Sequence, residues 1–286
     1  MQTLTLGDVG ISRVVEIGRS SFPTSQMLPE SDAGRIAAHH RWLTPHFFDE
    51  TTGDLGSRIQ TWIVRTPRHT VLVDTGVGND KERGDNPLWN RRTGGLLDDL
   101  RAAGVTPEQV DLVLCTHLHV DHVGWNTRLV DGRWLPTFPN ARYLLARPEW
   151  EHWSADPHPM NQTVLADSVR PIFDAGLVDL VATDHAVDAA ISLEPTPGHT
   201  PGHVSVHVRS RGEEAVITGD LVHHPAQFAR PHWGAAPDWD RALADRTRRA
   251  FMERYADTPV LVIGTHFAEP TAGRLVRDGD AYRLDA

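Results

Sequence analysis

The sequence predicts an α/β protein in which two mixed β-sheets pack face to face with helices on their outer sides, an αββα sandwich. Two observations lead to this prediction. Strand-like apolar runs occur in both halves of the 286-residue chain, and segments with helical periodicity lie between several of them. Because a sheet or an amphipathic helix must bury its apolar face against another element, such a chain forms layers. The sheets would form the centre and the helices would cover them.

Ten strands are expected from short apolar or alternating runs bounded by turn residues. They cover residues 12–17, 58–65, 70–74, 110–115, 142–146, 179–183, 191–194, 204–209, 215–220 and 260–263. A helix is expected at 91–103, where three leucines share one face, and a capped helical turn at 106–109. A surface helix is expected at 238–255, where apolar residues recur among many charges.

Composition excludes several classes of protein. The formal net charge is −10 at pH 7 and no run of lysine or arginine occurs, which argues against a nucleic-acid surface. No apolar stretch approaches the roughly 20 residues that a membrane span needs. Residues 1–8 lack the basic and apolar regions of a signal peptide, so a cytoplasmic location is expected. The single cysteine, Cys115, excludes an internal disulfide.

The most informative pattern is Thr-His-Leu-His-Val-Asp-His at 116–122, directly after a strand-like run. Imidazole nitrogens and carboxylate oxygens are ligands for divalent ions such as zinc. In an extended chain alternate residues project to the same side, so His117 and His119 can converge on one ion. If the chain then turns into a helix, Asp121 and His122 point toward a second ion. The spacing therefore predicts a site for two metal ions.

Further ligands are expected from later segments, because catalytic zinc typically takes three protein ligands and a water. Three apolar runs are each followed by a ligand type, and the candidates are His199, Asp220 and His266. Open α/β sheets place their ligands at the carboxyl ends of strands. Because these ligands are spread along the chain and must meet at one place, we expect a single domain over residues 1–286.

Two short sequence similarities link the halves of the chain. Residues 71–74 resemble 216–220, and residues 115–117 resemble 264–266. Two related halves would bring four strand ends together, although similarities this short do not prove a duplication.

With these motifs in this order, the chain resembles the metallo-β-lactamase superfamily of hydrolases between Ile59 and His266. The resemblance implies the metallo-β-lactamase fold and two divalent metal ions, zinc by preference, with manganese, iron or cobalt as alternatives. It implies that His117, His119 and His199 hold one ion, that Asp121, His122 and His266 hold the other, and that Asp220 bridges both. It also implies that Asp74 orients a ligating histidine from outside the ligand set. His203 is interpreted as a brace for the loop that carries His199.

Charge balance at such a site favours hydrolysis. Two divalent ions bring four positive charges, Asp121 and Asp220 remove two, and a bridging hydroxide removes a third. The remaining positive charge polarises a carbonyl or phosphoryl oxygen, and the pKa of metal-bound water falls from about 15.7 to around 7. We therefore expect a metal-dependent hydrolase in which the bridging hydroxide cleaves an ester. Asp121 is expected to shuttle the proton.

Departures from the patterns of individual subfamilies narrow the choice of substrate. Asp220 counts against true β-lactamases, which usually lack it. Only twenty residues follow His266, which counts against a thioesterase of the glyoxalase II type. A full second metal site counts against an iron-dependent dioxygenase. What remains resembles the branch of lactonases and methyl parathion hydrolase.

The favoured substrate is a lactone, either an acyl-homoserine lactone or another small apolar lactone. The alternative is a phosphotriester, another organophosphate or an aryl ester cleaved at the same site. Acyl-homoserine lactonases usually have a tyrosine three residues after the bridging aspartate, whereas this chain has His223. Histidine also donates a proton near neutral pH. The sequence leaves open whether His223 is a catalytic proton donor or a structural residue.

Residues 19–54 contain three of the prolines and several aromatic residues without strong periodicity. A long ordered loop of this kind commonly forms a lid, a pocket wall or a subunit contact. We expect it to cover the metals, to line an apolar pocket for a small-molecule substrate through Phe22, Trp42, Phe47 and Phe48, and to help form a homodimer.

Overall fold

A computed structural model describes residues 3–39 and 41–286, so residues 1–2 and 40 lie outside the description. The chain divides into two compact units, each built from two separate stretches of sequence. Unit 1 comprises Met1–Glu16 and Ile59–His185, and unit 2 comprises Ile17–Arg58 and Ala186–Ala286. Each unit has its own apolar core. The organisation of residues 1–286 as a single domain stays a prediction.

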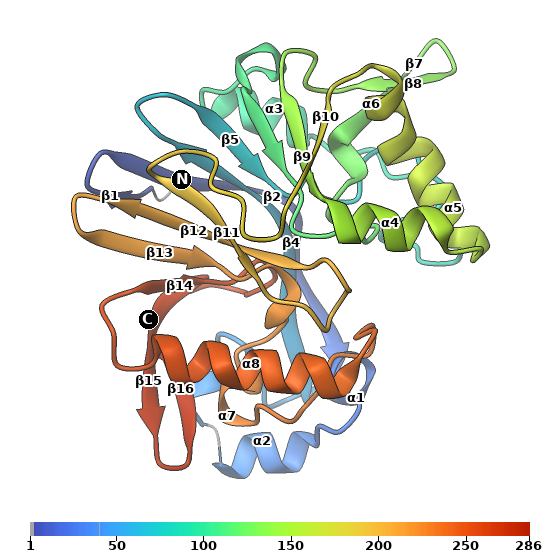
Figure 1. The fold of residues 1–286 in the computed structure, drawn as a ribbon. Helices are drawn as coiled ribbons and strands as arrows, with labels where there is room; N and C mark the ends of the chain where they lie inside the picture. Colours follow the sequence, from blue (N-terminus) through green and yellow to red (C-terminus); the bar gives the residue numbers. More distant parts are fainter. Residues whose placement is uncertain (1–2, 40) are drawn as a thin grey trace. The chain divides into compact units, whose positions relative to one another are not determined.

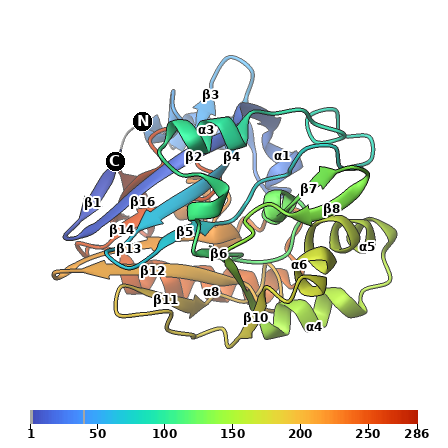
Figure 2. The ribbon, with the colours of Figure 1, turned by 90° about the horizontal axis from the view of Figure 1, so that it is seen from above.

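The main sheet of unit 1 has the strand order β1-β2-β4-β5-β6-β9-β10 (Figures 1 and 2). These strands are β1 (Leu4–Leu6), β2 (Val9–Pro23), β4 (Asp54–Arg65), β5 (Thr70–Val73), β6 (Leu112–Leu114), β9 (Arg142–Ala146) and β10 (Val178–Val181). Strands β2 and β4 each continue into the residues of unit 2. Strands β5, β6, β9 and β10 run parallel, so their carboxyl ends lie along one edge of the sheet.

The helices of unit 1 pack on this sheet through apolar side chains. They are α3 (Leu96–Ala102), α4 (Arg147–Ala155), α5 (Pro159–Val164), a π-helical turn at Leu165–Val169 and α6 (Arg170–Asp174). A hairpin of β7 (Thr127–Val130) and β8 (Arg133–Pro136) forms a separate small sheet. Leu100 of α3 and Ile172 of α6 belong to the same buried cluster as Val113 of β6 and Leu145 of β9. This cluster is the core of unit 1.

The sheet of unit 2 has the order β11-β12-β13-β14-β15-β16. Its strands are β11 (Ile191–Pro195), β12 (Val204–Ser210), β13 (Glu213–Ile217), β14 (Leu261–Ile263), β15 (Ala272–Asp278) and β16 (Ala281–Asp285). Among the described strands of this sheet, β13 and β14 pair in parallel, and every other neighbouring pair is antiparallel. The other regular elements of unit 2 are α1 (Thr24–Met27), α2 (Ala33–His39), β3 (Phe48–Asp49), α7 (Ala226–Ala229), α8 (Arg241–Tyr255) and the helical turns Arg41–Leu43 and Gly219–Leu221.

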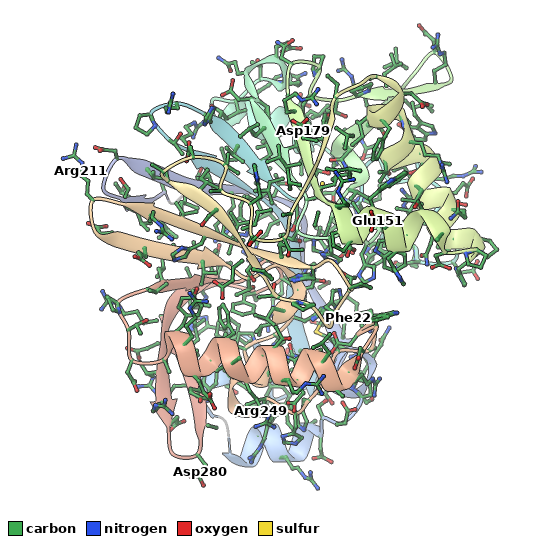
Figure 3. All side chains as sticks on the ribbon, viewed as in Figure 1. Phe22, Glu151, Asp179, Arg211, Arg249 and Asp280 are labelled. Carbon is green, nitrogen blue, oxygen red and sulfur yellow. The ribbon has the colours of Figure 1, made fainter. Side chains whose placement is uncertain are left out.

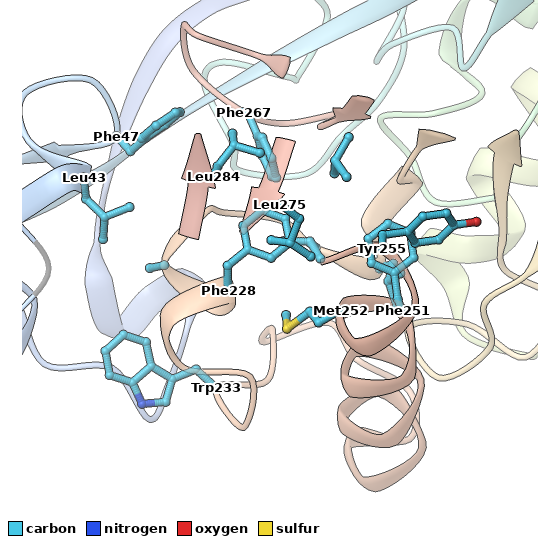
Figure 4. Close-up of a cluster of buried hydrophobic side chains, with 14 of the residues drawn as sticks. Leu43, Phe47, Phe228, Trp233, Phe251, Met252, Tyr255, Phe267, Leu275 and Leu284 are labelled. Carbon is cyan, nitrogen blue, oxygen red and sulfur yellow. The ribbon is translucent and has the colours of Figure 1, made fainter. Parts of the chain in front are cut away.

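The core of unit 2 is rich in aromatic side chains (Figure 4). Phe228 and Phe267 meet edge to face with ring centroids 5.9 Å apart. Met252 of α8 is fully buried in the same cluster as these rings and Leu275 of β15. The helix therefore covers one face of the sheet, as the apolar positions of 238–255 indicated.

All ten expected strands are present, each within a few residues of its expected bounds. The helix expected at 238–255 begins later, at Arg241, because the carboxylate of Asp240 caps it by accepting a hydrogen bond from the Leu243 amide at 2.9 Å. The helix expected at 91–103 is limited to α3. Among the described residues, no helix is both long enough and apolar enough to cross a membrane.

The expectation of a continuous loop at 19–54 is wrong. Two short helices and a strand lie within this stretch, apart from residue 40, which is outside the description. Leu28, Ile36 and Leu43 from this stretch are fully buried in the core of unit 2. Much of the segment is therefore held in place by packing, and a role as a lid or dimer contact stays a prediction.

The two units repeat one local arrangement. In unit 1, β5 pairs in parallel with β6, and Asp74 and His117 follow the ends of these strands. In unit 2, β13 pairs in parallel with β14, and Asp220 and His266 follow their ends. The short sequence similarities between the halves therefore lie in similar surroundings, with an acid after one strand and a histidine after its parallel neighbour. The acids differ in detail, because Asp74 directly follows β5 and Asp220 lies in the helical turn after β13.

A buried ionic cluster links two segments of unit 1. Arg83 donates two hydrogen bonds of 2.8 Å to the carboxylate of Asp167, which lies in the π-helical turn. Lys81 donates to the hydroxyl of Thr127 at 2.8 Å, and its Nζ lies 3.8 Å from the centroid of the Trp134 ring. Burial, opposed by the charge of Asp167, lowers the pKa of Lys81 to about 7.

This pKa predicts a pH-dependent contribution to stability. From about pH 7 to pH 10.5 the unfolded lysine holds a proton that the folded lysine has lost, so the free energy of unfolding should rise with pH, by at most about 1.4 kcal/mol per pH unit. Urea unfolding of the wild type and of Lys81→Met at pH 6, 7, 8 and 9 tests this. The difference between the two proteins should grow above pH 7 in favour of the wild type. If the difference in the free energy of unfolding between the two proteins stayed constant with pH, it would contradict the lowered pKa of Lys81.

Candidate metal centre

The structure places the seven predicted ligands in two groups, one in each unit. The group in unit 1 follows β6. His117 is buried, and its Nε2 lies 3.0 Å from Nδ1 of His119. Two nitrogens bound to one tetrahedral ion at about 2.0–2.1 Å would be about 3.3 Å apart. The two nitrogens therefore have nearly the separation of a pair of metal ligands, although the residues lie in a turn after β6 and not in the extended chain that the alternation assumed.

The second pair in unit 1 is oriented by Asp74. His122 is fully buried, and its Nδ1 lies 2.9 Å from a carboxylate oxygen of Asp74. Its Nε2 lies 3.7 Å from Oδ1 of Asp121. Asp74 also accepts hydrogen bonds from the amide and the hydroxyl of Thr116, at 2.7 and 2.9 Å. The carboxylate thus fixes one nitrogen of His122 and turns the other toward Asp121, which is the role that the resemblance implied.

Two buried acids that the sequence analysis missed hold loops of unit 1 in place, Glu149 the loop that carries the ligands and Glu16 the loop after Asp74. Glu149 of α4 accepts hydrogen bonds from the amide of Leu118 at 3.1 Å and from the indole of Trp153 at 2.5 Å. Glu16 accepts from the amides of Val77 and Gly78 at 2.6 and 3.0 Å. Burial raises the pKa of Glu16 despite these donors. Neither acid lies in a local sequence pattern that marks such a role.

The group in unit 2 is arranged around Asp220, which is 3% exposed. Nε2 of His266 lies 3.1 Å from Oδ1 of Asp220. Nε2 of His199 and Nε2 of His223 lie 3.5 and 3.1 Å from Oδ2. Each carboxylate oxygen therefore faces imidazole nitrogens, which suits a carboxylate that offers one oxygen to each of two ions.

The opposite nitrogen of His199 and that of His266 are each held by a hydrogen-bond acceptor. Nδ1 of His199 lies 2.9 Å from Oδ1 of Asp238, and Nδ1 of His266 lies 2.8 Å from the carbonyl of Arg58. Burial works against the ionisation of Asp238, but the hydrogen bond with His199 and nearby positive charges outweigh it and lower the pKa of Asp238 to about 2. An ionised acceptor at Nδ1 leaves Nε2 as the ligand nitrogen of His199.

His203 braces the loop of His199. Its Nε2 accepts a hydrogen bond from the amide of Asp220 at 2.8 Å, and its Nδ1 lies 2.8 Å from the hydroxyl of Thr196. Both ring nitrogens are thus engaged by protein groups, in agreement with its interpretation as a structural residue.

His223 lies within the ligand group of unit 2. It is 6% exposed, and its ring stacks on that of His266 with an interplanar angle of 13°. Its amide donates a hydrogen bond of 2.8 Å to the side-chain oxygen of Gln227. His199, His223 and Asp238 offer ligand atoms within 4.8 Å of one another. The side chain is therefore close to reacting groups, and its role as a proton donor stays a prediction.

The chemistry of both groups fits divalent metal ions. Within each unit, buried imidazole nitrogens lie close to a carboxylate, His122 beside Asp74 and both His199 and His266 beside Asp220. Imidazole nitrogens and carboxylate oxygens are the ligands that zinc and similar divalent ions take. The contacts of His122 with Asp74 and of His199 with Asp238 are those that ligating histidines make in metal sites.

The aromatic residues expected to line a substrate pocket have different environments. Phe47 and Phe48 are 3% and 1% exposed and belong to the core of unit 2, so packing accounts for their positions. Trp42 is half-buried against the same core, and Phe22 is half-buried near the end of β2, where Figure 3 labels it. A pocket lined by these four residues stays a prediction.

Comparison with known proteins agrees with this architecture. The sequence profile of the Metallo-beta-lactamase superfamily matches residues 56–266. The N-acyl homoserine lactonase AttM of Rhizobium radiobacter is 28% identical over 178 residues, which span 58% of this chain and 62% of AttM. A protein of the same name from Rhizobium johnstonii is 28% identical over 161 residues, 54% of this chain and 56% of its own length. The chain thus aligns with less than two thirds of these relatives.

Solved structures extend the similarity of the fold over almost the whole chain. The hydrolase AbOPH of the beta lactamase superfamily has a TM-score of 0.81 at 24% identity, covering 99% of this chain and 96% of its own. AidC, a dizinc quorum-quenching lactonase solved with a product, has a TM-score of 0.81 at 22% identity with the same coverage. At these identities the likeness concerns the fold, and it confirms the predicted fold class.

Proposed function

The chain belongs to the metallo-beta-lactamase superfamily, and from this membership we propose that it is a metal-dependent hydrolase of ester bonds whose substrates are lactones. The observation that carries the proposal is the environment of Asp220, whose two oxygens face His266 on one side and His199 and His223 on the other. A buried carboxylate in this setting is suited to bridging two cations. A mononuclear oxygenase or a binding module would not require a buried carboxylate placed between two cations.

We propose that seven side chains hold two divalent ions, zinc by preference, since a catalytic zinc typically takes three protein ligands and a water. The ligands are His117, His119, Asp121, His122, His199, Asp220 and His266. When bound, the ions would supply a polarised ester carbonyl and a water whose pKa is lowered to about 7. No serine or cysteine nucleophile is then required.

The side chains of the protein would direct the reaction. Addition of water to a lactone carbonyl breaks the ring C–O bond and gives a carboxylate and an alcohol, so the leaving oxygen must gain a proton. Nε2 of His223, 3.1 Å from Asp220, is the donor that we propose for this step. Asp121, which is partly exposed, would accept the proton that the attacking water loses.

Relatives support the choice of lactones. AttM is named as an N-acyl homoserine lactonase, and AidC was solved with the product of a lactone. The alternative is an organophosphate triester or an aryl ester cleaved at the same site. His223 motivates this alternative, because it occupies the position at which acyl-homoserine lactonases usually have a tyrosine.

A substrate panel tests the proposal. The zinc-loaded protein would be assayed with N-hexanoyl homoserine lactone, a phosphotriester, an aryl ester and a β-lactam, following proton release at constant pH. We expect the largest kcat/KM for the lactone, and its loss on dialysis against a chelator with recovery on addition of zinc. Turnover of the β-lactam or the phosphotriester above that of the lactone would contradict the proposed substrate class.

Replacement of His223 by alanine tests the proton donor. We expect kcat for the lactone to fall by about 10²- to 10⁴-fold, the usual contribution of a general acid, while the metal content stays at the wild-type level. The exposed residue His232 provides the matched control, since His232→Ala should leave kcat unchanged. A His223→Ala variant with wild-type kcat would show that His223 is structural.

A further inference from the structure

The guanidinium of Arg248 lies at the centre of the part of unit 2 that carries the ligands. Arg248 is on α8 and is 0% exposed. It donates hydrogen bonds to the carbonyls of Leu221 at 3.0 Å, Pro231 at 2.8 Å and Trp233 at 3.3 Å. It also donates to the carboxylate of Asp238 at 3.3 Å. Burying a charged side chain is unfavourable unless it is paired, so packing alone does not account for an arginine here.

One of these contacts leads to His199. Asp238 accepts from Arg248 through Oδ2 and contacts Nδ1 of His199 through Oδ1 at 2.9 Å. The amide of Ala235 donates to Oδ2 at 2.8 Å and further fixes the carboxylate. With its position set from two sides, the carboxylate holds the imidazole of His199 in one orientation.

A second contact leads to Asp220. The residue after Asp220 is Leu221, whose carbonyl accepts the hydrogen bond from Nε of Arg248. Asp220 lies inside the turn Gly219–Leu221 with φ −94° and ψ 15°, outside the regular helical range. The hydrogen bond on this carbonyl fixes the peptide plane between Leu221 and Val222 and so anchors the end of the short turn that carries Asp220.

The loop of His199 is also tied directly to α8 and to the turn before it. The amides of Trp239 and Asp240 donate to the carbonyls of His199 and Gly198, at 3.0 and 2.9 Å. A Cβ at Gly198 would lie 2.3 Å from the amide nitrogen of Ala244, and the φ of Gly198 is +131°. Only glycine permits so close an approach of the loop to the helix. Helix α8 and the turn before it therefore hold this loop in place.

We propose that Arg248 is a positioning residue that couples His199 to Asp220: through Asp238 it orients one metal ligand, and through the carbonyl of Leu221 it orients the other. The inference rests on the proposed function, because it treats both residues as ligands. The inference goes beyond the proposed function, because it assigns part of the metal affinity of unit 2 to a side chain that itself binds no metal. Loss of such outer contacts typically weakens metal binding by about 10- to 100-fold.

The neighbouring residue offers a matched control. Arg249 lies on the same helix, and its guanidinium pairs with the carboxylate of Asp245 at 3.0 Å on the outer side (Figure 3). Its side chain is 48% exposed, whereas that of Arg248 is 0% exposed. Arg249→Met therefore removes the same charge from the same helix without touching either ligand-bearing segment.

The test is cobalt binding by four variants of the full chain: Arg248→Met, Arg248→Lys, Asp238→Asn and Arg249→Met. The metal-free proteins would be titrated with Co²⁺ while the visible absorption spectrum is recorded, and the melting temperature of each metal-free protein would be measured separately. We expect Arg248→Met and Asp238→Asn to weaken binding at one site by about 10- to 100-fold and to alter its spectrum. Arg248→Lys should recover part of the affinity, and Arg249→Met should match the wild type.

Each result has a defined meaning. Lower melting temperatures with wild-type affinity and spectrum in both Arg248→Met and Asp238→Asn would overturn the inference and leave a purely structural role. If Arg248→Met does not fold, Asp238→Asn and Arg248→Lys decide the question alone. A wild type that binds no Co²⁺ would instead overturn the proposed function, and the inference with it.

Discussion

Replacing Asp220 by alanine should abolish hydrolysis, lowering kcat/KM for the lactone by more than about 10³-fold. The carboxylate faces His199, His223 and His266 at 3.5, 3.1 and 3.1 Å, so its removal takes away the negative charge that both ions would share. The metal content per chain should fall in the same variant. Steady-state kinetics and elemental analysis of the same preparation measure the two effects together.

A surface carboxylate provides the control for this substitution. Asp245 on α8 pairs with Arg249 at 3.0 Å and, in the described part of the chain, forms no hydrogen bond or ion pair with His199, Asp220 or His266, so Asp245→Asn should retain wild-type kinetics and metal content. Asp220→Ala with full activity would mean that Asp220 is not a bridging ligand, whatever its metal content.

Replacing Phe267 by alanine should have the largest effect on stability, lowering the free energy of unfolding by about 3–5 kcal/mol. The ring is fully buried and packs edge to face on Phe47 and Phe228, with centroids 6.4 and 5.9 Å away. Figure 4 labels the three rings. The backbone of Gly264 approaches so closely that a Cβ there would lie 2.1 Å from the ring. Because Phe267 directly follows His266, the cavity should also loosen this proposed metal ligand. Urea unfolding of the metal-free protein isolates the packing effect.

Leu135→Ala is the corresponding surface change. Leu135 lies on β8 and is 38% exposed, so its loss should alter the free energy of unfolding by less than about 0.5 kcal/mol. A decrease below 1.5 kcal/mol for Phe267→Ala would show that the core of unit 2 relaxes around the missing ring more fully than close packing allows.

The elements that sequence analysis located are those with a strong local pattern. The proposed ligands His117, Asp220 and His266 each follow an apolar strand. The strand period of two does not describe residues 116–122, because β6 ends at Leu114 and the chain turns there, so that His122 as well as His119 lies beside His117. The fold class followed from the alternation of such strands with helices. These signals are local, since the residues that create them are adjacent in the chain.

Asp238 and Arg248 could not be found in this way. Asp238 contacts His199, which is 39 residues earlier, and no spacing rule relates the two. In the sequence both residues belong to a run with many charges, where a solvent-exposed face is the ordinary interpretation. Their burial is set by the packing of α8 on the sheet of unit 2, which only the tertiary structure shows.

The hairpin of β15 and β16 was missed although the sequence contains a signal for it. Asp278 and Gly279 precede Asp280 and Ala281, and an Asp-Gly pair between alternating apolar residues is a strong indication of a tight turn between strands. Figure 3 labels Asp280 at the tip of this turn.

Titration of the metal-free protein with zinc, with lactone hydrolysis measured at each addition, tests the central claim most directly. The proposed dinuclear site predicts that activity rises until two ions are bound per chain and then becomes constant. It also predicts that Asp220→Ala stays inactive at every ratio. Full activity with a single ion per chain, or hydrolysis that persists in metal-free protein, would contradict the account.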